Sequence, residues 1–368
     1  MKFSAQRESL LEPLQQVAGA VERRQTKPVL GNVLIACTDA GITLTATDGE
    51  IELCATRSIA VDVAGSITVP ARKLLEICRH LPEQVRVTCE LTGDKAVLKT
   101  GRSRFTLATL PAEQFPETDP LVDGQRITLP IESLREAMRS TAFSMAQQDV
   151  RFYLNGMLLE IAPERVCCVS TDGHRLAWSQ VSTDVSPETP VRAIIPRKSV
   201  GELTKILSAA PDDGSVELHL TEQQLQVSLE DIRLTTRLVD GRFPDYKRVI
   251  PIDSNKELVM DTQSLRQSLT RASVLSNEKY RGIRLALASG VLTISSNNPE
   301  QEEAIDELEV DYQGEATEIG FNVTYLLEAL GAIETESVRL MLKDSGSSLL
   351  MTPDGNTDCK YVVMPMRL

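Results

Sequence analysis

The sequence predicts an α+β protein made of three tandem copies of one folding unit, on the basis of three observations. Landmark residues recur at a nearly constant interval, helix-like segments recur at the same interval, and strand-like segments fill the space between them. Gly31, Gly156 and Gly282, for example, are separated by 125 and then 126 residues. This period is longer than that of solenoid repeats, so each copy is large enough to be a domain with its own core.

Further landmarks keep the same order and period, which a chance match would not do. They are Thr47-Asp48-Gly49 with Thr171-Asp172-Gly173 and Asn297-Asn298, Pro70 with Pro196 and Phe321, and Phe115-Pro116 with Phe243-Pro244. Turn-rich stretches at residues 120–125 and 251–256 separate the copies. We therefore expect domains at residues 1–121, 126–250 and 251–368.

Each copy begins with a predicted amphipathic helix, at residues 7–23, 131–148 and 262–278. In the first, Leu10, Leu14 and Val17 recur at helical spacing. An alternating segment at residues 42–46, an Asp-Gly turn and residues 51–53 then predict a β-hairpin. A second helix is expected at residues 71–80, 197–207 and 322–331. Few helices and many antiparallel strands predict a helix layer on one face of a sheet.

Charge is unevenly distributed along the 368 residues, whose net charge is −13. The six predicted helical segments, counted over residues 7–24, 71–80, 131–149, 197–207, 262–281 and 322–331, hold 15 Lys and Arg against 10 Asp and Glu. The remainder holds 24 against 42. If the helices line a concave side, a mildly positive wall suits sequence-independent contact with duplex phosphates. Ordinary solvation of helix faces explains the same counts equally well.

Seven cysteines without a C-x-x-C pair indicate buried, reduced thiols. The neighbouring Cys167 and Cys168 leave open a redox reading, although adjacent side chains of an extended segment point to opposite faces. No apolar run approaches the ~20 residues of a membrane helix, and the first eight residues lack the apolar stretch of a signal peptide. These observations predict a cytoplasmic protein.

Catalytic constellations are sparse. Neither G-x-x-x-x-G-K-[ST] nor G-x-G-x-x-G occurs, and the three histidines, His80, His174 and His219, do not stand at metal-ligand spacing. Ser170 beside Asp172 and His174 is better explained as a turn between strands than as a catalytic triad. The acidic run Glu300-Gln301-Glu302-Glu303 could bind a cation, but it is more typical of a solvated face. We expect no catalytic residue, no metal and no cofactor; a thiol enzyme using Cys167-Cys168 and a peptide-binding scaffold are the competing hypotheses.

Longer strings carry a family resemblance that covers the whole chain. They are FSMAQQDVRFYLNGMLLE (143–160), STDGHRLA (170–177), DGRFPDYKRV (240–249), SNEKYRGIRL (276–285), NNPEQEEA (297–304) and YVVMPMRL (361–368). With them the sequence closely resembles the bacterial sliding clamp family, the beta subunit of DNA polymerase III.

The resemblance implies the clamp fold, with three similar domains per chain and two chains joined head to tail in a six-domain ring whose helices line the central hole. It further implies a non-catalytic processivity factor. An ATP-driven clamp loader would place the ring on primed DNA, where it would tether the replicative DNA polymerase. The implied partners are double-stranded DNA, the polymerase, the loader, other proteins with a clamp-binding motif and a second copy of the chain, and no membrane.

Site residues follow from the resemblance position by position. The DNA-contacting positions are Arg24, Arg72, Gln148, Phe152 and Tyr153. Phe152 departs from the Tyr-Tyr pair that such clamps can show, so it keeps stacking area and loses a hydroxyl. Two simpler interpretations remain open: core packing for Phe152 and a solvated helix end for Arg24.

A second implied site is a cleft between the second and third domains, where a short hydrophobic peptide of each partner docks. Its positions here are Leu154, Thr171, Gly173, His174, Arg175, Leu176, Pro244, Arg248, Val249, Tyr325, Val362, Met364, Pro365 and Met366. Flexible methionine side chains suit a surface that accepts several ligands. The same residues 361–366 also fit a last strand that closes its sheet.

The joint between two chains is the third implied site. The resemblance places residues 102–107 of one chain against the third domain of the other. The residues expected there are Lys73, Arg102, Phe105, Leu107, Val274, Leu275, Glu300 and Glu302. Buried apolar contact should dominate this joint, because surface ion pairs contribute only about 0–1 kcal/mol.

Overall fold

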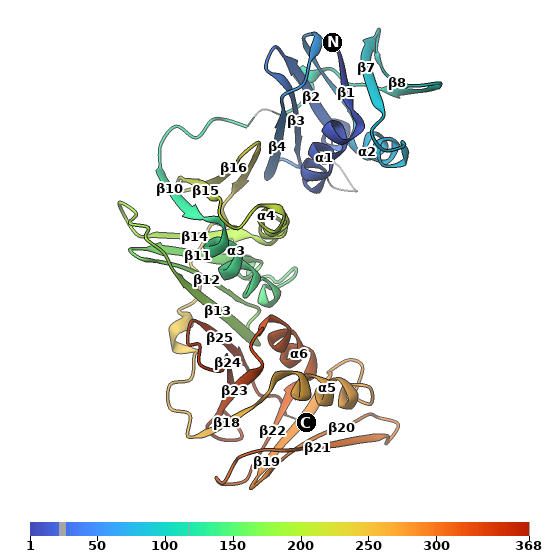
Figure 1. The fold of residues 1–368 in the computed structure, drawn as a ribbon. Coiled ribbons are helices and arrows are strands. Elements are labelled where there is room, and N and C mark those ends of the chain that lie inside the picture. The colour runs from blue at the N-terminus through green and yellow to red at the C-terminus, as the bar shows by residue number, and fades with distance from the viewer. Residues whose placement is uncertain (22–26, 117, 368) are drawn as a thin grey trace. The chain divides into compact units, whose positions relative to one another are not determined.

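A computed structural model describes residues 1–21, 27–116 and 118–367 of the chain (Figure 1). These residues form two compact units, one made of residues 1–131 and 201–238 and the other of residues 132–200 and 239–368. The boundary between the units runs through the second predicted copy instead of falling at its ends. No helix in the described part of the chain is long and apolar enough to span a membrane.

Two α-helices occur in each predicted copy, as the sequence indicates. They are α1 (Arg7–Val17), α2 (Ala71–His80), α3 (Ile131–Arg139), α4 (Arg197–Ala209), α5 (Thr262–Ser273) and α6 (Val323–Ala332). Within these bounds the helices hold eleven Lys and Arg against seven Asp and Glu. The observed helices therefore keep the mildly basic balance that the predicted ones had.

The first helix of each copy is shorter than predicted. Helix α1 buries Leu10, Leu14 and Val17 but gives way to a 3-10 turn that contains Gly19, a residue that disfavours helix. Helix α3 ends at Arg139, and the Thr141 hydroxyl then donates to the Ala137 carbonyl at 2.8 Å. Such bonds from a side chain to the backbone compete with helix continuation.

Helix α5 likewise ends at Ser273 instead of continuing toward residue 278. The reason lies in Asn277, whose side-chain oxygen accepts bonds from the backbone N–H groups of Lys279 and Tyr280 at 2.9 and 3.0 Å. This asparagine turn redirects the chain before the next strand. Apolar periodicity alone, which continues past residue 273, could not reveal it.

The first unit contains a five-stranded and an eight-stranded antiparallel sheet, in the orders β5-β1-β7-β8-β9 and β10-β15-β16-β17-β4-β3-β2-β6. Their strands are β1 (Lys2–Gln6), β2 (Asn32–Thr38), β3 (Gly41–Thr47), β4 (Ile51–Arg57), β5 (Val61–Val63), β6 (Gly65–Pro70), β7 (Arg86–Thr92), β8 (Lys95–Thr100), β9 (Ser103–Ala108), β10 (Gln125–Pro130), β15 (Ser215–Leu220), β16 (Gln224–Leu229) and β17 (Ile232–Arg237).

The second unit contains an eight-stranded and a four-stranded antiparallel sheet, in the orders β14-β11-β12-β13-β25-β24-β23-β18 and β21-β20-β19-β22. Their strands are β11 (Gly156–Ala162), β12 (Arg165–Thr171), β13 (Arg175–Ser182), β14 (Val191–Pro196), β18 (Lys256–Asp261), β19 (Gly282–Ala288), β20 (Val291–Asn297), β21 (Glu303–Glu309), β22 (Thr317–Asn322), β23 (Ser337–Leu342), β24 (Leu349–Pro353) and β25 (Cys359–Val363).

Neighbouring copies share sheets, which explains why the compact units ignore the predicted boundaries. Strand β17 of the second copy pairs with β4 of the first, with Leu234 opposite Leu53. Strand β25 of the third copy pairs with β13 of the second, with Tyr361 opposite Ala177. Each eight-stranded sheet is therefore half from one copy and half from the next.

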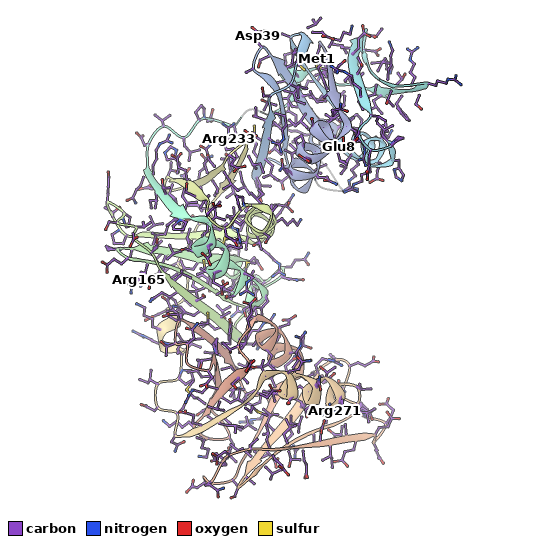
Figure 2. The ribbon with its side chains drawn as sticks, in the orientation of Figure 1. Met1, Glu8, Asp39, Arg165, Arg233 and Arg271 are labelled. Atoms are coloured by element: carbon purple, nitrogen blue, oxygen red, sulfur yellow. The ribbon has the colours of Figure 1, made fainter. Side chains whose placement is uncertain are left out.

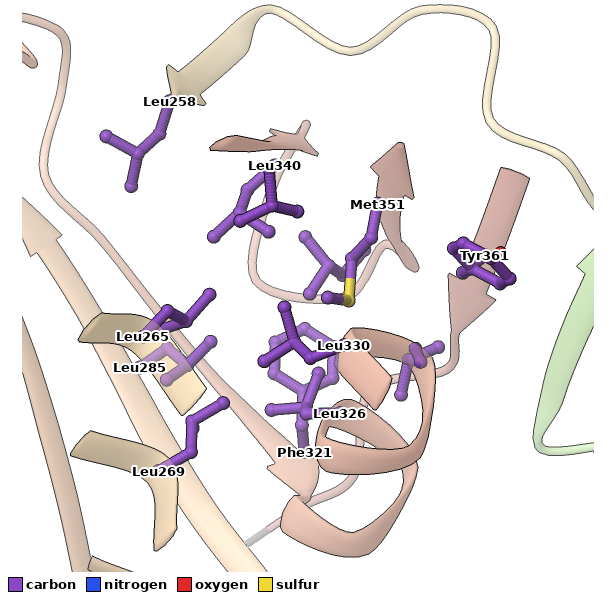
Figure 3. Close-up of a cluster of buried hydrophobic side chains, with 14 of the residues drawn as sticks. Leu258, Leu265, Leu269, Leu285, Phe321, Leu326, Leu330, Leu340, Met351 and Tyr361 are labelled. Carbon is purple, nitrogen blue, oxygen red and sulfur yellow. The ribbon is translucent and has the colours of Figure 1, made fainter. Parts of the chain in front are cut away.

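The core of the third copy lies between its two sheets, where α5 and α6 contact each other (Figure 3). Leu265 and Leu269 of α5 and Leu326 and Leu330 of α6 are buried there, and Tyr361 of β25 is also nearly inaccessible. Burying each leucine stabilises the fold by roughly 1.5–3 kcal/mol. This core fixes β25, and with β25 the edge of the site described next.

Candidate functional site

The turn at residues 171–175 has the same hydrogen bonds as its counterpart in the first copy. The Asp172 carboxylate accepts the N–H groups of His174 and Arg175 at 2.9 and 3.0 Å, and the Gly173 N–H donates to the Thr171 hydroxyl at 3.1 Å. Gly173 has a φ of +89°, a conformation that favours glycine. The predicted turn is thus correct, and it is formed by hydrogen bonds between the Asp172 carboxylate and backbone N–H groups that include that of His174.

The equivalent turn in the first copy confirms the predicted hairpin between β3 and β4. There the Asp48 carboxylate accepts the N–H groups of Glu50 and Ile51 at 2.8 and 2.9 Å. Glu50 and Ile51 occupy the places that His174 and Arg175 take in the second copy. The backbone is therefore repeated, while the side chains that the turn presents are different.

Arg175 is the central side chain of the site and is only 9% exposed. Its guanidinium donates to the Asp172 carboxylate at 3.0 Å, to the Phe143 carbonyl at 2.8 Å and to the Glu328 carboxylate of α6. The same group lies 4.5 Å from the centre of the Tyr325 ring. Charge-assisted bonds of this kind are among the stronger ones in proteins, so Arg175 ties the turn to helix α6.

His174 extends the site outward. Its ring lies parallel to the Tyr325 ring, with a centroid separation of 6.5 Å and an interplanar angle of 16°. The His174 carbonyl accepts the Met364 N–H at 2.9 Å, which continues the pairing of β13 with β25 by one more bond. A cavity of about 570 Å³ opens beside these residues, lined also by Phe143, Asp172 and Glu328.

An apolar floor lies on one face of β13 and β25. Leu176 and Val362 are directly opposite each other, and both are buried in a cluster that includes Leu350. Val249 and Tyr153 pack against the same cluster, and the neighbouring Leu154 is also buried. Apolar residues from three separate parts of the chain thus meet at one place.

Most of the predicted cleft residues are therefore brought together within the second unit. Thr171, Gly173, His174, Arg175 and Leu176 form the turn and the start of β13, and Val362 and Met364 lie alongside. Met364 is exposed at its edge, whereas Pro365 and Met366 are half-buried. The Met366 N–H donates to the Gly320 carbonyl at 2.8 Å, so the chain end is held against β22.

Two predicted cleft residues, Pro244 and Arg248, are less closely tied by contacts to the rest of the site. Arg248, whose side chain is 86% exposed, forms an ion pair at 2.9 Å with Asp245 of its own turn, and Pro244 is half-buried beside them. The sequence reasoning missed Phe143, Asp172 and Glu328, which hold Arg175 in place. Asp172 was identified only as a turn residue, and nothing in the local pattern around Glu328 indicates an ion pair with a residue 153 positions away.

Three of the predicted DNA-contacting residues, Arg72, Gln148 and Phe152, are exposed, whereas Tyr153 is half-buried. Arg72 is exposed on α2, and Arg24 lies outside the described residues. Gln148 is exposed with a φ of +55°, and Phe152 is 57% exposed with its ring edge-on to Tyr153. The alternative of simple core packing for Phe152 is therefore wrong.

The loop that presents Phe152 is held by a carboxylate. Asp149 accepts the Arg151 backbone N–H at 2.8 Å and two guanidinium bonds of the same residue at 2.8 and 3.0 Å. These bonds from Arg151 lower the pKa of Asp149 from 3.8 to about 2. At neutral pH Asp149 is therefore ionised. Its three bonds to Arg151, here called the Asp149 clasp, hold the loop beside the exposed Val150 and Phe152.

The predicted joint residues lie on or near the free ends of two sheets, on β9 and α2 of the first unit and beside α5 and β21 of the second. Phe105 and Leu107 belong to β9, the edge strand of the five-stranded sheet, and Arg102 is exposed just before it, as is Lys73 on α2. On the other unit, Val274 is 76% exposed and Leu275 half-buried after α5, and Glu300 and Glu302 are exposed before β21. On the edge strand β21, Ile305 is 61% exposed, whereas Ala304 and Leu308 face the other way and pack against the core of the third copy.

The candidate nucleophiles Cys167, Cys168 and Ser170 are not arranged for catalysis in the described part of the chain. Cys167 and Cys168 are both buried, and burial raises the pKa of Cys167 to about 12 and that of Cys168 well above its usual value. The buried Ser170 hydroxyl donates to the Thr141 carbonyl. Among the residues that the structure describes, no group of three His, Cys, Asp or Glu side chains is arranged to hold a metal ion.

Comparison with known proteins gives one consistent family. Models for the DNA polymerase III beta subunit match the chain in three parts, the N-terminal domain at residues 1–119, the central domain at 128–245 and the C-terminal domain at 247–367. The chain is 49% identical over 369 residues to a beta sliding clamp of Pseudomonas putida and 45% identical over 370 residues to that of Escherichia coli strain K12, with full coverage of both chains in each case.

Solved structures agree with the sequence relatives. The DNA polymerase III subunit beta of Pseudomonas aeruginosa has a TM-score of 0.94 and 47% identity, with each chain fully covered. A sliding clamp of the same organism bound to griselimycin matches with a TM-score of 0.94 and 48% identity, again over all of both chains. The sliding clamp of Bacillus subtilis, at 28% identity, still reaches 0.93 over 100% of this chain and 99% of its own.

Proposed function

Because the chain belongs to the DNA polymerase III beta subunit family of sliding clamps, we propose that it encircles duplex DNA and tethers the replicative DNA polymerase for processive synthesis. Three clamp domain models match in order along the chain, and relatives at 45–49% identity are beta sliding clamps. The chain is therefore a processivity factor without catalytic activity of its own. It acts on DNA inside the cell, and we assign it to the cytoplasm.

The repeat itself supports a head-to-tail joint between two copies. Strands β9, β17 and β25 take the same place in the three domains, and β4, β13 and β21 share another. Within the chain β17 pairs with β4 and β25 with β13, while β9 and β21 remain at sheet edges. Pairing β9 of one copy with β21 of a second would complete the pattern and cover both edges.

The register of that joint follows from the two pairings within the chain. Leu234 lies opposite Leu53 and Tyr361 opposite Ala177. The equivalent residues at the joint are Phe105 and Ala304, both half-buried on the core side of their sheets. Arg104 would then lie opposite Ile305, whose neighbours on the same face of β21 are Glu303 and Glu307, so the basic side chains beside Phe105 would meet the acidic strand β21. Two such joints would close two chains into a ring of six domains.

For the domains we propose boundaries at residues 1–121, 126–250 and 251–368. The matches of the family models to residues 1–119, 128–245 and 247–367 support these limits within a few residues at most ends. The shared sheets mean that these domains are units of sequence more than of independent folding.

DNA contact is assigned to Arg24, Arg72, Gln148, Phe152 and Tyr153, without base specificity. The exposure of Arg72, Gln148 and Phe152 supports the assignment. A cationic side chain contributes to phosphate affinity whatever the base sequence. The partly exposed Phe152 ring offers a flat surface for stacking, although it cannot donate a hydrogen bond as tyrosine does.

Partner peptides are assigned to the apolar floor around Leu176, Val362 and Met364. The buried floor, the exposed methionine edge and the His174–Tyr325 pair support a site for a short hydrophobic segment. The replicative polymerase, the clamp loader and other proteins with a clamp-binding motif would compete for it. Deleting residues 364–368 should abolish binding of polymerase and loader while leaving the dimer intact; partner binding that survives the deletion would refute this location.

The topological experiment tests the clamp function as a whole. The protein is loaded by a bacterial clamp loader with ATP onto a nicked circular plasmid, and half of the sample is then cut once with a restriction enzyme. A clamp stays on the circle and slides off the linear form, as measured by gel filtration of labelled protein with the DNA. Equal retention on both forms would instead indicate a peptide-binding scaffold that adheres to DNA without enclosing it.

A further inference from the structure

We propose that a cavity on the β11–β14 part of the second unit binds a small aryl carboxylate, an anion with a flat apolar body. The cavity has a volume of about 490 Å³ and lies on the sheet under residues 246–252. Small-molecule sites in proteins are usually concave, mostly apolar, and about 300–1,000 Å³ in volume. This inference does not depend on the clamp function proposed above.

The strand register builds the floor of the cavity. Arg192, Glu160, Cys167 and Gln180 form one row across β14, β11, β12 and β13, each residue opposite the next. Trp178 lies two residues from Gln180 on the same face and is opposite Lys360 of β25. Because side chains two residues apart on a strand share a face, these residues present one continuous surface.

A turn covers this floor and separates it from the partner cleft. In the segment at residues 246–252, Tyr246 and Lys247 line the cavity, whereas the next two residues, Arg248 and Val249, belong to the cleft assignment. Tyr246 is buried and packs in the same apolar cluster as Cys167. This cluster also forms the floor of the cleft, but no described residue that lines the cavity belongs to the cleft assignment, so a ligand there would leave the cleft residues uncovered.

Aromatic and neutral side chains make the cavity suitable for a flat apolar group. The half-buried Trp178 and the buried Tyr246 and Cys167 provide its walls. The Tyr246 hydroxyl donates to the Glu160 carboxylate at 2.7 Å, and burial and this bond raise the tyrosine pKa above its usual value. Tyr246 and Cys167 are both uncharged at neutral pH, so they favour stacking over ion binding.

The polar lining is predominantly positive, which selects an anion. Four cations, Arg165, Arg192, Lys247 and Lys360, surround a single carboxylate, that of Glu160. Arg192 lies 3.6 Å from this carboxylate, which is already occupied by Tyr246. Within the described ranges the other three cations form no ion pair, and the Lys360 Nζ atom lies 4.8 Å from the centre of the Trp178 ring. Arg165, at the start of β12, is labelled in Figure 2.

The combination of aromatic wall and adjacent cations is what specifies the ligand. The flat body of an aryl carboxylate would lie against Trp178, and its carboxylate would reach Lys360 and Arg165. A neutral molecule of the same shape would gain only the apolar contact. An inorganic anion would gain only the charge contact, in a partly open site where water screens it.

The test uses the intrinsic fluorescence of Trp178, the only tryptophan of the chain. Full-length protein is titrated with biphenyl-4-carboxylate and, separately, with biphenyl-4-carboxamide, which has the same shape without the charge. We expect a saturable change in fluorescence with the carboxylate, an affinity at least tenfold lower for the amide, and weakening of carboxylate binding as salt is raised. An absent or unsaturable response, or equal affinity for both compounds, would overturn the proposal.

Variants then locate the site, with binding measured by calorimetry because changes beside Trp178 alter its fluorescence. Lys360→Gln with Arg165→Gln should reduce carboxylate affinity about tenfold and leave amide affinity unchanged. Ala162→Leu, which fills the cavity from β11, should reduce binding of both compounds. Lys279→Gln is the matched control, since Lys279 also lies over an aromatic ring, 5.2 Å from the centre of Tyr280, outside the cavity. Carboxylate binding that is indifferent to the double variant, or sensitive to Lys279→Gln, would contradict the site.

Discussion

The guanidinium carbon of Arg175 lies 4.5 Å from the centre of the Tyr325 ring. Arg175 comes from the second repeat and Tyr325 from α6 of the third, so this contact holds two repeats together beside the proposed peptide cleft. Phe143, Asp172 and Glu328 supply the remaining partners of the same guanidinium. The cleft thus depends on a largely buried cation that lines the cavity and is held by contacts from both repeats.

Replacing this cation should destabilise the protein. Arg175→Ala removes the guanidinium donor of one Asp172 carboxylate oxygen and of the Phe143 carbonyl, and removing one partner of a buried ion pair costs about 3–5 kcal/mol. We expect the unfolding transition of the second unit to move to lower urea concentration by an amount equivalent to about 3 kcal/mol. Arg248→Ala is the matched control, because its exposed ion pair with Asp245 contributes at most about 1 kcal/mol. Equal effects of the two changes would show that the Arg175 contacts contribute little.

The chain joint predicts a second, selective effect. Phe105→Asp places a charge on the edge strand β9, where this side chain is expected to lie opposite Ala304 of another copy. Sedimentation velocity should show a dimer for the unaltered protein and a monomer for this variant. Val259→Asp, an exposed apolar residue on the edge strand β18, should leave the dimer unchanged. A dimer that tolerates Phe105→Asp would place the joint elsewhere.

Phosphate contact predicts a change in salt dependence. Each phosphate contact contributes about 0.9 to the slope of log affinity against log salt for duplex DNA. Arg24→Ala combined with Arg72→Ala should therefore weaken DNA association and reduce the slope by about 2, as measured by fluorescence anisotropy at several salt concentrations. Arg126→Ala on β10, which removes a cation paired with Glu217 of β15, serves as the comparison. An unchanged slope in the double variant would mean that those two side chains do not reach phosphate.

The Asp149 clasp predicts a pH dependence at the acid end. Its folded-state pKa of about 2 lies below the usual 3.8, so the carboxylate stabilises the folded loop above the usual pKa. This contribution is lost as the pH falls from about 4 through about 2, because protonation removes the acceptor of the Arg151 bonds. Carbon NMR of the labelled carboxyl group should give the midpoint near 2. Arg151→Ala should return that midpoint toward 3.8, and a wild-type midpoint already near 3.8 would exclude the clasp.

Local chemistry carried much of the prediction from sequence. The three copies, the second helix of each and the Asp-Gly turn at Gly49 were predictable because each rests on short-range patterns. A glycine at positive φ and, directly before it, an aspartate that accepts the N–H groups two and three residues further on determine such a turn without help from the rest of the chain. Where helices end was less predictable, since the bonds of Thr141 and Asn277 that end α3 and α5 leave no mark in the apolar periodicity.

Long-range pairing set the limit for the candidate sites. The resemblance supplied Arg175 and Tyr325, but no pattern near residue 328 indicates that Glu328 completes the Arg175 ion pair. The free edges of β9 and β21 likewise depend on which strands end a sheet, a property of the whole topology. The cavity beside Trp178 was absent from the sequence-based expectations, because five strands and a turn have to meet before it exists.

Because neighbouring repeats share sheets, one repeat at each end of the series has an edge strand without a partner. The first repeat has β9 and the third has β21, and inserting a fourth repeat between them would still leave one such strand at each end. Strand pairing alone therefore does not determine how many repeats form a closed assembly. That number depends on the angle between neighbouring repeats at each shared sheet. The middle repeat would be the most prone to aggregation on its own. Excising it would remove the partners of both β17 and β13 and leave two exposed edge strands on one small fragment.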